Sequence, residues 1–150
     1  VYGEARVYDS ARVCGSARVC ASARVYGSAR VYGEARVCGS ALVCGSARVC
    51  DSARVCGEAR VRKGEHTISP IYIQGTRYWL CYSGDGLVSS GCITKPLEWW
   101  LEHVERCAEN HGYTPEQQKE YRLHVEHIAA WMRLYGLCDG EKKDASATTA

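Results

Sequence analysis

The sequence lacks two kinds of apolar segment. It has no run of about 20 apolar residues, which a helix needs in order to span a bilayer. It also has no stretch in which basic residues lead into an apolar segment, as they do in a secretion signal. We therefore expect neither a membrane protein nor a secreted one, and the predicted location is the cytoplasm.

The sequence also has only a small excess of positive over negative charge. The 150 residues carry 19 basic and 17 acidic side chains, a formal net charge of +2. The balance is uneven along the chain, because residues 1–60 contain nine arginines and five acidic residues, whereas residues 61–150 contain ten basic and twelve acidic residues. Domains that bind DNA through charge alone are much more basic, so nucleic acid is not an expected partner.

The ten cysteines include no CxxC pair, the usual spacing of zinc ligands. Six of them share one position of a repeat that tyrosine occupies in other copies: Cys14, Cys20, Cys38, Cys44, Cys50 and Cys56. A position that accepts either residue is selected for packing, so we expect reduced thiols in a reducing cytosol, with a disulfide or a metal site as less favoured alternatives. No metal and no cofactor is predicted.

The sequence does contain a six-residue repeat, V-[YC]-[GDA]-[SE]-A-[RL], which occurs ten times over residues 1–60. An eleventh copy begins at Val61 and fails at once. A period of six equals three strand periods, which places valine and alanine on one face and arginine with tyrosine or cysteine on the other. Ten short strands without hairpin turns are typical of a solenoid.

The repeat resembles the hexapeptide repeat of left-handed parallel β-helices, in which an aliphatic residue is followed four positions later by a small one. The resemblance implies three hexapeptides per coil and therefore about three coils. Residues n and n+18 then stack at the sheet spacing of about 4.8 Å. We predict a left-handed parallel β-helix over residues 1–65, a small α+β domain over residues 66–138 and a disordered tail over residues 139–150.

Stacking in this register arranges the outward residues in columns. The candidate binding residues form two unbroken columns: Arg12, Arg30 and Arg48, and Arg18, Arg36 and Arg54. A third arginine column is interrupted by Leu42, beside a column of cysteines, and we expect a protein contact on this least charged wall. Stacked guanidinium groups repel, and an anionic ligand would relieve the repulsion. The favoured alternative is that Ser, Glu and water solvate the arginines and that the charge keeps the β-surface from sticking to other chains.

The repeat also lacks the residues that enzymes of similar fold use. Hexapeptide acyltransferases rely on a catalytic histidine near a projecting loop, and the related carbonic anhydrases hold a metal with three histidines. Residues 1–65 contain no histidine and no loop insertion. No catalytic residue is therefore predicted, and an acyltransferase-like site with His66 as base at a subunit interface is the least favoured alternative.

The segment after the repeat has a mixed pattern. Residues 76–82 and 87–93 are expected to pair as a hairpin around Asp85-Gly86. A helix is expected from Pro96 to about Asn110, and a second one after a capping box that begins at Thr114. We interpret this β-hairpin and its two helices as a cap for the solenoid and an assembly domain. Its candidate assembly residues, together with Leu42, are Tyr78, Trp79, Trp99, Trp100 and Trp131.

Four motifs of this segment resemble a small domain of uncharacterised bacteriophage and prophage proteins. They are Gly91-Cys92, the run from Leu97 to Glu102, the run from Asn110 to Gln117 and the run from Glu120 to Ile128. No catalytic residues come with the resemblance. His124 and His127 share a helix side with Glu120, but exposed histidines beside acidic residues are more often solvated than metal-bound, so no metal site is predicted there.

Together these observations predict a non-catalytic, phage-encoded accessory protein in the host cytoplasm. We expect it to bind a host protein by surface complementarity, for example as an inhibitor of an antiviral defence system. A homo-oligomer is expected, with a trimer favoured because flat prism walls pack around a threefold axis in proteins of this fold. The alternatives are a sponge that sequesters an anionic small molecule such as a signalling nucleotide, and a structural or assembly protein.

Overall fold

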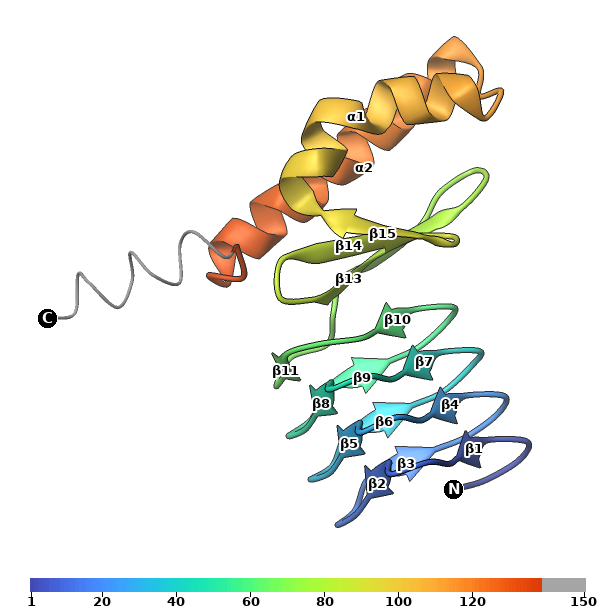
Figure 1. Cartoon of the computed structure of the whole chain (residues 1–150), viewed down its shortest axis with the longest axis vertical. Coiled ribbons are helices and arrows are strands. Elements are labelled where there is room, and N and C mark those ends of the chain that lie inside the picture. Colours follow the sequence, from blue (N-terminus) through green and yellow to red (C-terminus); the bar gives the residue numbers. More distant parts are fainter. Residues whose placement is uncertain (139–150) are drawn as a thin grey trace, which may run out of the picture. The chain divides into compact units, whose positions relative to one another are not determined.

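In the computed structural model, which describes residues 1–138, the repeat forms a parallel β-solenoid of about three turns (Figure 1). The predicted tail at residues 139–150 lies outside the described residues. Each hexapeptide contributes one strand of two residues. The ten strands are β1 (Arg6–Val7), β2 (Arg12–Val13), β3 (Arg18–Val19), β4 (Arg24–Val25), β5 (Arg30–Val31), β6 (Arg36–Val37), β7 (Leu42–Val43), β8 (Arg48–Val49), β9 (Arg54–Val55) and β10 (Arg60–Val61).

Each strand stacks on the strand that lies three hexapeptides further along the chain. Arg6 pairs with Arg24, Arg24 with Leu42, and Leu42 with Arg60. The strands β2, β5 and β8 and the strands β3, β6 and β9 repeat this register on the other two walls. With β11 (Glu65–His66) added next to β8, the three parallel sheets have the orders β1-β4-β7-β10, β11-β8-β5-β2 and β3-β6-β9. The predicted stacking of residues n and n+18 is therefore confirmed.

The interior of the solenoid consists of valine and alanine. From Val25 to Val49 every valine and alanine of the repeat is fully buried. The chain turns each corner at the third repeat position with a positive φ, as at Gly39, where φ is 69° and an added Cβ would lie 3.0 Å from the backbone N and O of Gly57 in the next turn. This close stacking favours glycine at the corners.

The last turn departs from the repeat. Strand β11 (Glu65–His66) pairs with β8 one position early, so that His66, rather than Thr67, stacks on Val49. A short segment, Cys81–Gly84, then covers the final turn: the amide N–H groups of Arg62 and Lys63 both donate to the carbonyl of Ser83, at N···O distances of 2.9 and 3.3 Å. The backbone groups at this end of the solenoid therefore find partners within the chain, as a solenoid end requires.

The chain divides into two compact units, residues 1–72 with 81–84, and residues 73–80 with 85–150. The domain boundary predicted from the sequence, between residues 65 and 66, therefore falls inside the first unit, within strand β11.

The second part of the chain forms a four-stranded sheet in the order β12-β13-β14-β15. Its strands are β12 (Tyr72–Gln74), β13 (Trp79–Gly84), β14 (Leu87–Ser90) and β15 (Ile93–Pro96). Asp85 and Gly86, between β13 and β14, have φ values of 50° and 76°, which the predicted tight hairpin turn requires. The sequence predicts a single strand over residues 87–93, but this prediction is wrong: the chain turns at Gly91 and Ile93 begins β15, which is antiparallel to β14.

Two helices complete the second unit: α1 (Leu97–Asn110) and α2 (Pro115–Leu134). The Thr114 side chain accepts a hydrogen bond from the Gln117 amide and the Gln117 side chain accepts one from the Thr114 amide, which confirms the predicted capping box. The apolar side chain of Leu123 on α2 is 65% exposed. In the described part of the chain neither helix is long and apolar enough to cross a membrane.

Candidate functional site

The six candidate arginines lie where the sequence predicts them, on the outside of the solenoid. Arg12, Arg30 and Arg48 form one column and Arg18, Arg36 and Arg54 another, each in register on adjacent strands. All six residues are exposed. Because adjacent strands are about 4.8 Å apart, each column spans about 10 Å and presents three positive charges in a row.

None of these six guanidinium groups has an ion pair or a side-chain hydrogen bond among residues 1–138. Arg122 pairs with Glu126 and Glu120 pairs with His124, both on α2. Acidic groups of the solenoid bond elsewhere: an Asp9 carboxylate oxygen accepts from the Gly27 amide, and Glu65 accepts from the Tyr32 hydroxyl at 3.0 Å. No serine or acidic side chain of the repeat is bonded to these six guanidinium groups within residues 1–138, so their charge lies at the surface of the solenoid.

The third column is interrupted as the sequence indicates. Leu42 stacks between Arg24 and Arg60 and is half-buried, whereas Arg24 is exposed. Beside the N-terminal part of this column the rings of Tyr8 and Tyr26 are stacked, with centroids 5.1 Å apart and an interplanar angle of 5°. This wall is therefore more apolar than the two walls that carry unbroken arginine columns.

His66, the base of the acyltransferase alternative, occupies a core position. It is 4% exposed, and its Nε2 lies 2.8 Å from the carbonyl oxygen of Lys63. The tilted ring of Tyr82 is 5.6 Å from the imidazole. An imidazole that bonds to a carbonyl and stacks on the valine column supports the end of the solenoid, and in this chain it has little surface with which to meet a substrate.

The candidate assembly aromatics of the second unit differ in their exposure. Trp79 and Trp100 are buried, and the Trp100 indole N–H donates to the carbonyl of Val88 at 2.9 Å. Trp99 and Trp131 are half-buried, and Tyr78 is 48% exposed. Burial makes the first two part of the unit's core, so Tyr78, Trp99 and Trp131 are the members that offer surface to another chain.

A cavity of about 160 Å³ lies within the second unit. Side chains from β14, β15, α1, α2 and the adjoining turns line it, with aromatic and sulfur-bearing ones in the majority, and only Tyr78 and Trp100 of these are candidate assembly residues. They include Tyr78, Cys92, Trp100, Cys107, His111, Tyr113 and Tyr121. Cys92, Trp100, His111, Tyr113 and Tyr121 lie in the four sequence motifs described above, but the sequence does not show that these separate segments meet around one cavity.

The walls of this cavity are fixed by hydrogen bonds. The Tyr121 hydroxyl accepts from the amides of Arg77 and Tyr78, at 3.0 and 2.6 Å, and donates to the Tyr78 carbonyl at 2.7 Å. Arg77 in turn donates to the carbonyls of His111 and Gly112 and lies over the Tyr113 ring. Burial and the neighbouring Tyr121 raise the pKa of Tyr113 to about 12, so this phenol stays neutral.

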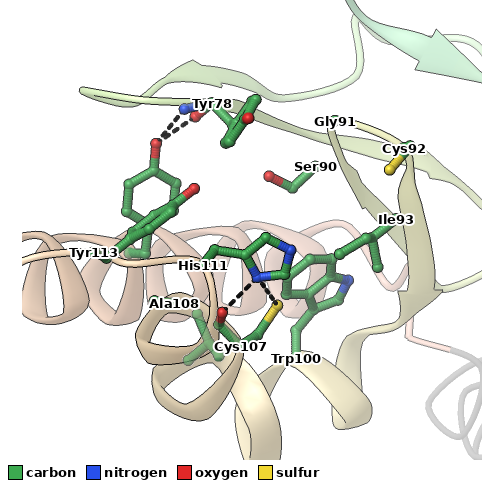
Figure 2. Close-up of a pocket in the computed structure, with 12 residues that line it drawn as sticks. Tyr78, Ser90, Gly91, Cys92, Ile93, Trp100, Cys107, Ala108, His111 and Tyr113 are labelled. Carbon is green, nitrogen blue, oxygen red and sulfur yellow. Dashed lines mark hydrogen bonds between the residues drawn. The ribbon is translucent and has the colours of Figure 1, made fainter.

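Cys107 and His111 are adjacent in the cavity but do not form a catalytic pair. His111 Nδ1 lies 2.7 Å from the Cys107 carbonyl oxygen and 3.8 Å from the Cys107 sulfur (Figure 2). Since a carbonyl can only accept, Nδ1 carries the proton and cannot take one from the thiol. Burial also raises the pKa of the Cys107 thiol, which disfavours the thiolate that a nucleophile needs.

The same tautomer gives the cavity a hydrogen-bond acceptor. With the proton on Nδ1, the Nε2 atom of neutral His111 has a free lone pair, and it has no partner among the described residues. The Ser90 hydroxyl also lines the cavity and is likewise unpartnered within residues 1–138. The cavity can therefore receive a planar aromatic group that carries an N–H or O–H donor.

The histidines of α2 are not arranged as metal ligands in the described chain. His124 Nε2 lies 3.0 Å from Glu120 Oε2, and no three His, Cys, Asp or Glu residues within residues 1–138 gather to hold a metal ion. Glu120 also accepts from the Thr76 hydroxyl at 2.7 Å and from the Thr76 amide at 3.0 Å. Burial opposes ionisation of Glu120, but the bonds from Thr76 and His124 outweigh it and lower the pKa of the carboxyl below its ordinary value.

Comparison with known proteins supports the solenoid alone. A protein-family model, the YdcK beta solenoid repeat, matches residues 29–45, which lie within the stacked strands described above. No curated protein and no solved structure matches the chain. The match covers a small part of the chain, and it identifies a repeat β-solenoid without indicating an activity.

The Glu120 contacts predict a pH-dependent contribution to the stability of the second unit. Because the folded-state pKa is lowered, ionised Glu120 stabilises the fold above the unfolded pKa of roughly 4.3, and this contribution is lost as the pH falls through the folded pKa. Glu120→Gln is expected to lower the thermal midpoint at pH 7, and the difference from the native chain should shrink steadily on acidification below about pH 4.

Thermal unfolding followed by circular dichroism from pH 7 to pH 3 measures this difference. Glu105→Gln is the matched control, since Glu105 is an exposed carboxylate on α1 with no bonded partner in the described chain. A difference between Glu120→Gln and the native chain that stays constant with pH would contradict the assignment.

Proposed function

We propose that this protein is a non-catalytic binding protein whose solenoid presents arginine columns to an acidic surface of another protein. The observation that supports the proposal most is that six exposed arginines stand in register on two walls without any ion pair in the described chain. Like charges about 5 Å apart repel each other by about 1 kcal/mol in water. A partner with carboxylates at matching positions replaces this repulsion with charge-assisted hydrogen bonds.

A protein suits these columns better than a small anion does. Each column extends over about 10 Å, and its charges are fixed to backbone strands that cannot close around a ligand. A rigid, repetitive and charged wall favours fast, electrostatically steered contact with an extended acidic surface. The resemblance of the second unit to phage and prophage domains supports a host protein as that partner, with inhibition of an antiviral defence system as the specific hypothesis.

The first test neutralises one column. A fluorescein-labelled polyglutamate peptide serves as a probe of acidic protein surfaces, and its binding is measured by fluorescence anisotropy at low and at physiological salt. The triple variant Arg12→Gln, Arg30→Gln, Arg48→Gln is expected to bind at least tenfold more weakly than the native chain (about 1.4 kcal/mol). The native affinity itself should fall as salt rises.

The matched control removes the same charge elsewhere. The triple variant Arg106→Gln, Lys119→Gln, Arg133→Gln removes three exposed positive charges from the second unit, and it should change the affinity less than twofold. Equal losses in both triple variants would overturn the role of the columns. Tighter binding to a single-stranded oligonucleotide or to a nucleotide than to the peptide would overturn the choice of a protein partner.

We further propose that the wall interrupted by Leu42 is the contact of a homo-oligomer, with a trimer favoured. Leu42→Arg tests this directly, because arginine restores the repeat and occupies the same position in the neighbouring strands at Arg24 and Arg60. The backbone should therefore fold unchanged. Sedimentation equilibrium is expected to give three chains per particle for the native protein and a single chain for Leu42→Arg. A native monomer, or identical masses for both chains, would refute the contact.

The cavity of the second unit favours a second candidate function, the binding of a small aromatic molecule. Its 160 Å³ is close to the roughly 150 Å³ of an engineered apolar cavity that admits benzene. The acceptor at His111 Nε2 selects a ring with an N–H or O–H donor. Indole, used as a probe at millimolar concentration, is expected to raise the thermal midpoint of the native chain, and benzothiophene, which lacks the donor, should raise it less.

Ala108→Leu provides the structural control for the cavity. Ala108 is 5% exposed and lines the cavity, so the added side chain fills the space and should abolish the stabilisation by indole. Ala130→Leu adds the same atoms at an exposed position of α2 and should leave the response intact. A response that survives Ala108→Leu would place the probe elsewhere.

A further inference from the structure

One column of the solenoid consists of cysteine in three successive turns. Cys20, Cys38 and Cys56 occupy the same position of every third hexapeptide. Backbone hydrogen bonds set their spacing: the Cys20 amide donates to the Val37 carbonyl, and the Cys38 amide to the Val55 carbonyl, both at 2.9 Å. The sulfur atoms of Cys38 and Cys56 lie 3.2 Å apart.

The other thiols of the repeat are not paired with a thiol in this way. Cys44 follows Tyr26 in its column, and Cys50 follows Tyr32 in its column. Both are buried, at 6% and 3% exposure, and the Cys50 sulfur is 3.8 Å from Glu65 Oε1. Cys56, by contrast, is exposed, and Cys38 and Cys20 are half-buried. Oxidants in the solvent therefore reach the one column in which thiols are neighbours.

The geometry of this column suits a disulfide. In-register residues on adjacent strands have Cα atoms about 4.8 Å apart, inside the range of roughly 4.4–6.8 Å that disulfides span. Closing the sulfur separation from 3.2 Å to a covalent bond of about 2.05 Å needs only small rotations of two side chains. No backbone movement is required, because the hydrogen bonds between turns already hold the two residues side by side.

We propose that Cys38 and Cys56 are an oxidation site, at which a peroxide forms a reversible disulfide that links the second turn of the solenoid to the third. The Cys56 thiolate attacks the peroxide O–O bond, which gives a sulfenic acid and releases one water molecule after proton transfer. The Cys38 sulfur then displaces the hydroxyl group, which leaves as a second water molecule with the Cys38 proton. The two thiols lose two electrons and two protons, and one hydrogen peroxide becomes two water molecules.

Cys20 gives the column a third thiol in line with the disulfide. Its side chain interacts with that of Cys38. A thiolate at Cys20 attacks the Cys38 sulfur and expels the Cys56 thiolate, since exchange proceeds through attack of a thiolate on a disulfide sulfur. The bond then joins Cys20 to Cys38 and the Cys56 thiol is free, with no net oxidation. The cross-link is therefore able to move by one turn along the column.

Peptide mapping of the full-length protein tests the proposal. The reduced chain is treated with a small excess of hydrogen peroxide, and its remaining thiols are alkylated. The intact mass before alkylation is expected to fall by about 2 Da as two hydrogens are lost. Trypsin, which cleaves after the arginine of each repeat, should release residues 37–48 joined to residues 55–60, and dithiothreitol should separate them. Because residues 37–48 also contain Cys44, the mapping is repeated with Cys44→Ser, in which the same cross-link should form.

Two variants separate the column from the other thiols. In Cys56→Ser the cross-link should shift to Cys20 and Cys38, seen as residues 19–24 joined to residues 37–48. Cys14→Ser, which removes an exposed cysteine outside the column, should leave the native cross-link unchanged. A mass gain of about 32 or 48 Da without any disulfide, or cross-links between chains through Cys14 or Cys92 in place of the internal bond, would overturn the proposal. Mapping of the native chain decides the matter even if a variant fails to fold.

Discussion

The backbone hydrogen bonds between successive turns are the constraint on which the rest of the solenoid depends. They connect residues three hexapeptides apart on all three walls, and each hexapeptide therefore has the same partner position above and below it. The repeat sequence follows from this geometry. Valine and alanine fill an interior too narrow for larger side chains, and glycine dominates corners where the backbones of neighbouring turns come within van der Waals distance.

The same constraint determines the surface. Identical residues in every third hexapeptide lie directly above one another in successive turns. Arginine therefore stacks on arginine, and the thiols of one column are neighbours. Acidic residues of the repeat occupy the third and fourth positions, at the corners, while arginine occupies the sixth, on the flat walls. The acidic residues of the repeat therefore lie at the corners, and the two arginine columns keep their positive charge on the flat walls of the first unit.

The solenoid can be predicted from the sequence because every hexapeptide repeats the same short pattern of residues. The stacking of Arg12 on Arg30 and the interruption at Leu42 follow from the repeat together with the three hexapeptides per coil that its resemblance to hexapeptide β-helices implies, and the tight turn follows from the residue types Asp85-Gly86. The cavity around His111 does not, because its lining comes from segments whose proximity depends on how two helices pack on a sheet. Leu123 illustrates the same limit: its position on α2 fits an apolar face, but no element of the described chain covers it.

The register of the turns also governs how such a chain can change in length. A tandem insertion of three hexapeptides between β4 and β7 would add one complete turn and return every later strand to its original wall. An insertion of a single hexapeptide would rotate all later strands by one wall, so the outward columns before and after it would no longer be continuous. The pairing of β11 with β8 and the bonds of Ser83 to the final turn lie after the insertion and would be kept in either case. The solenoid can therefore grow or shrink by whole turns, each carrying its own set of arginines, while its terminal structure stays the same.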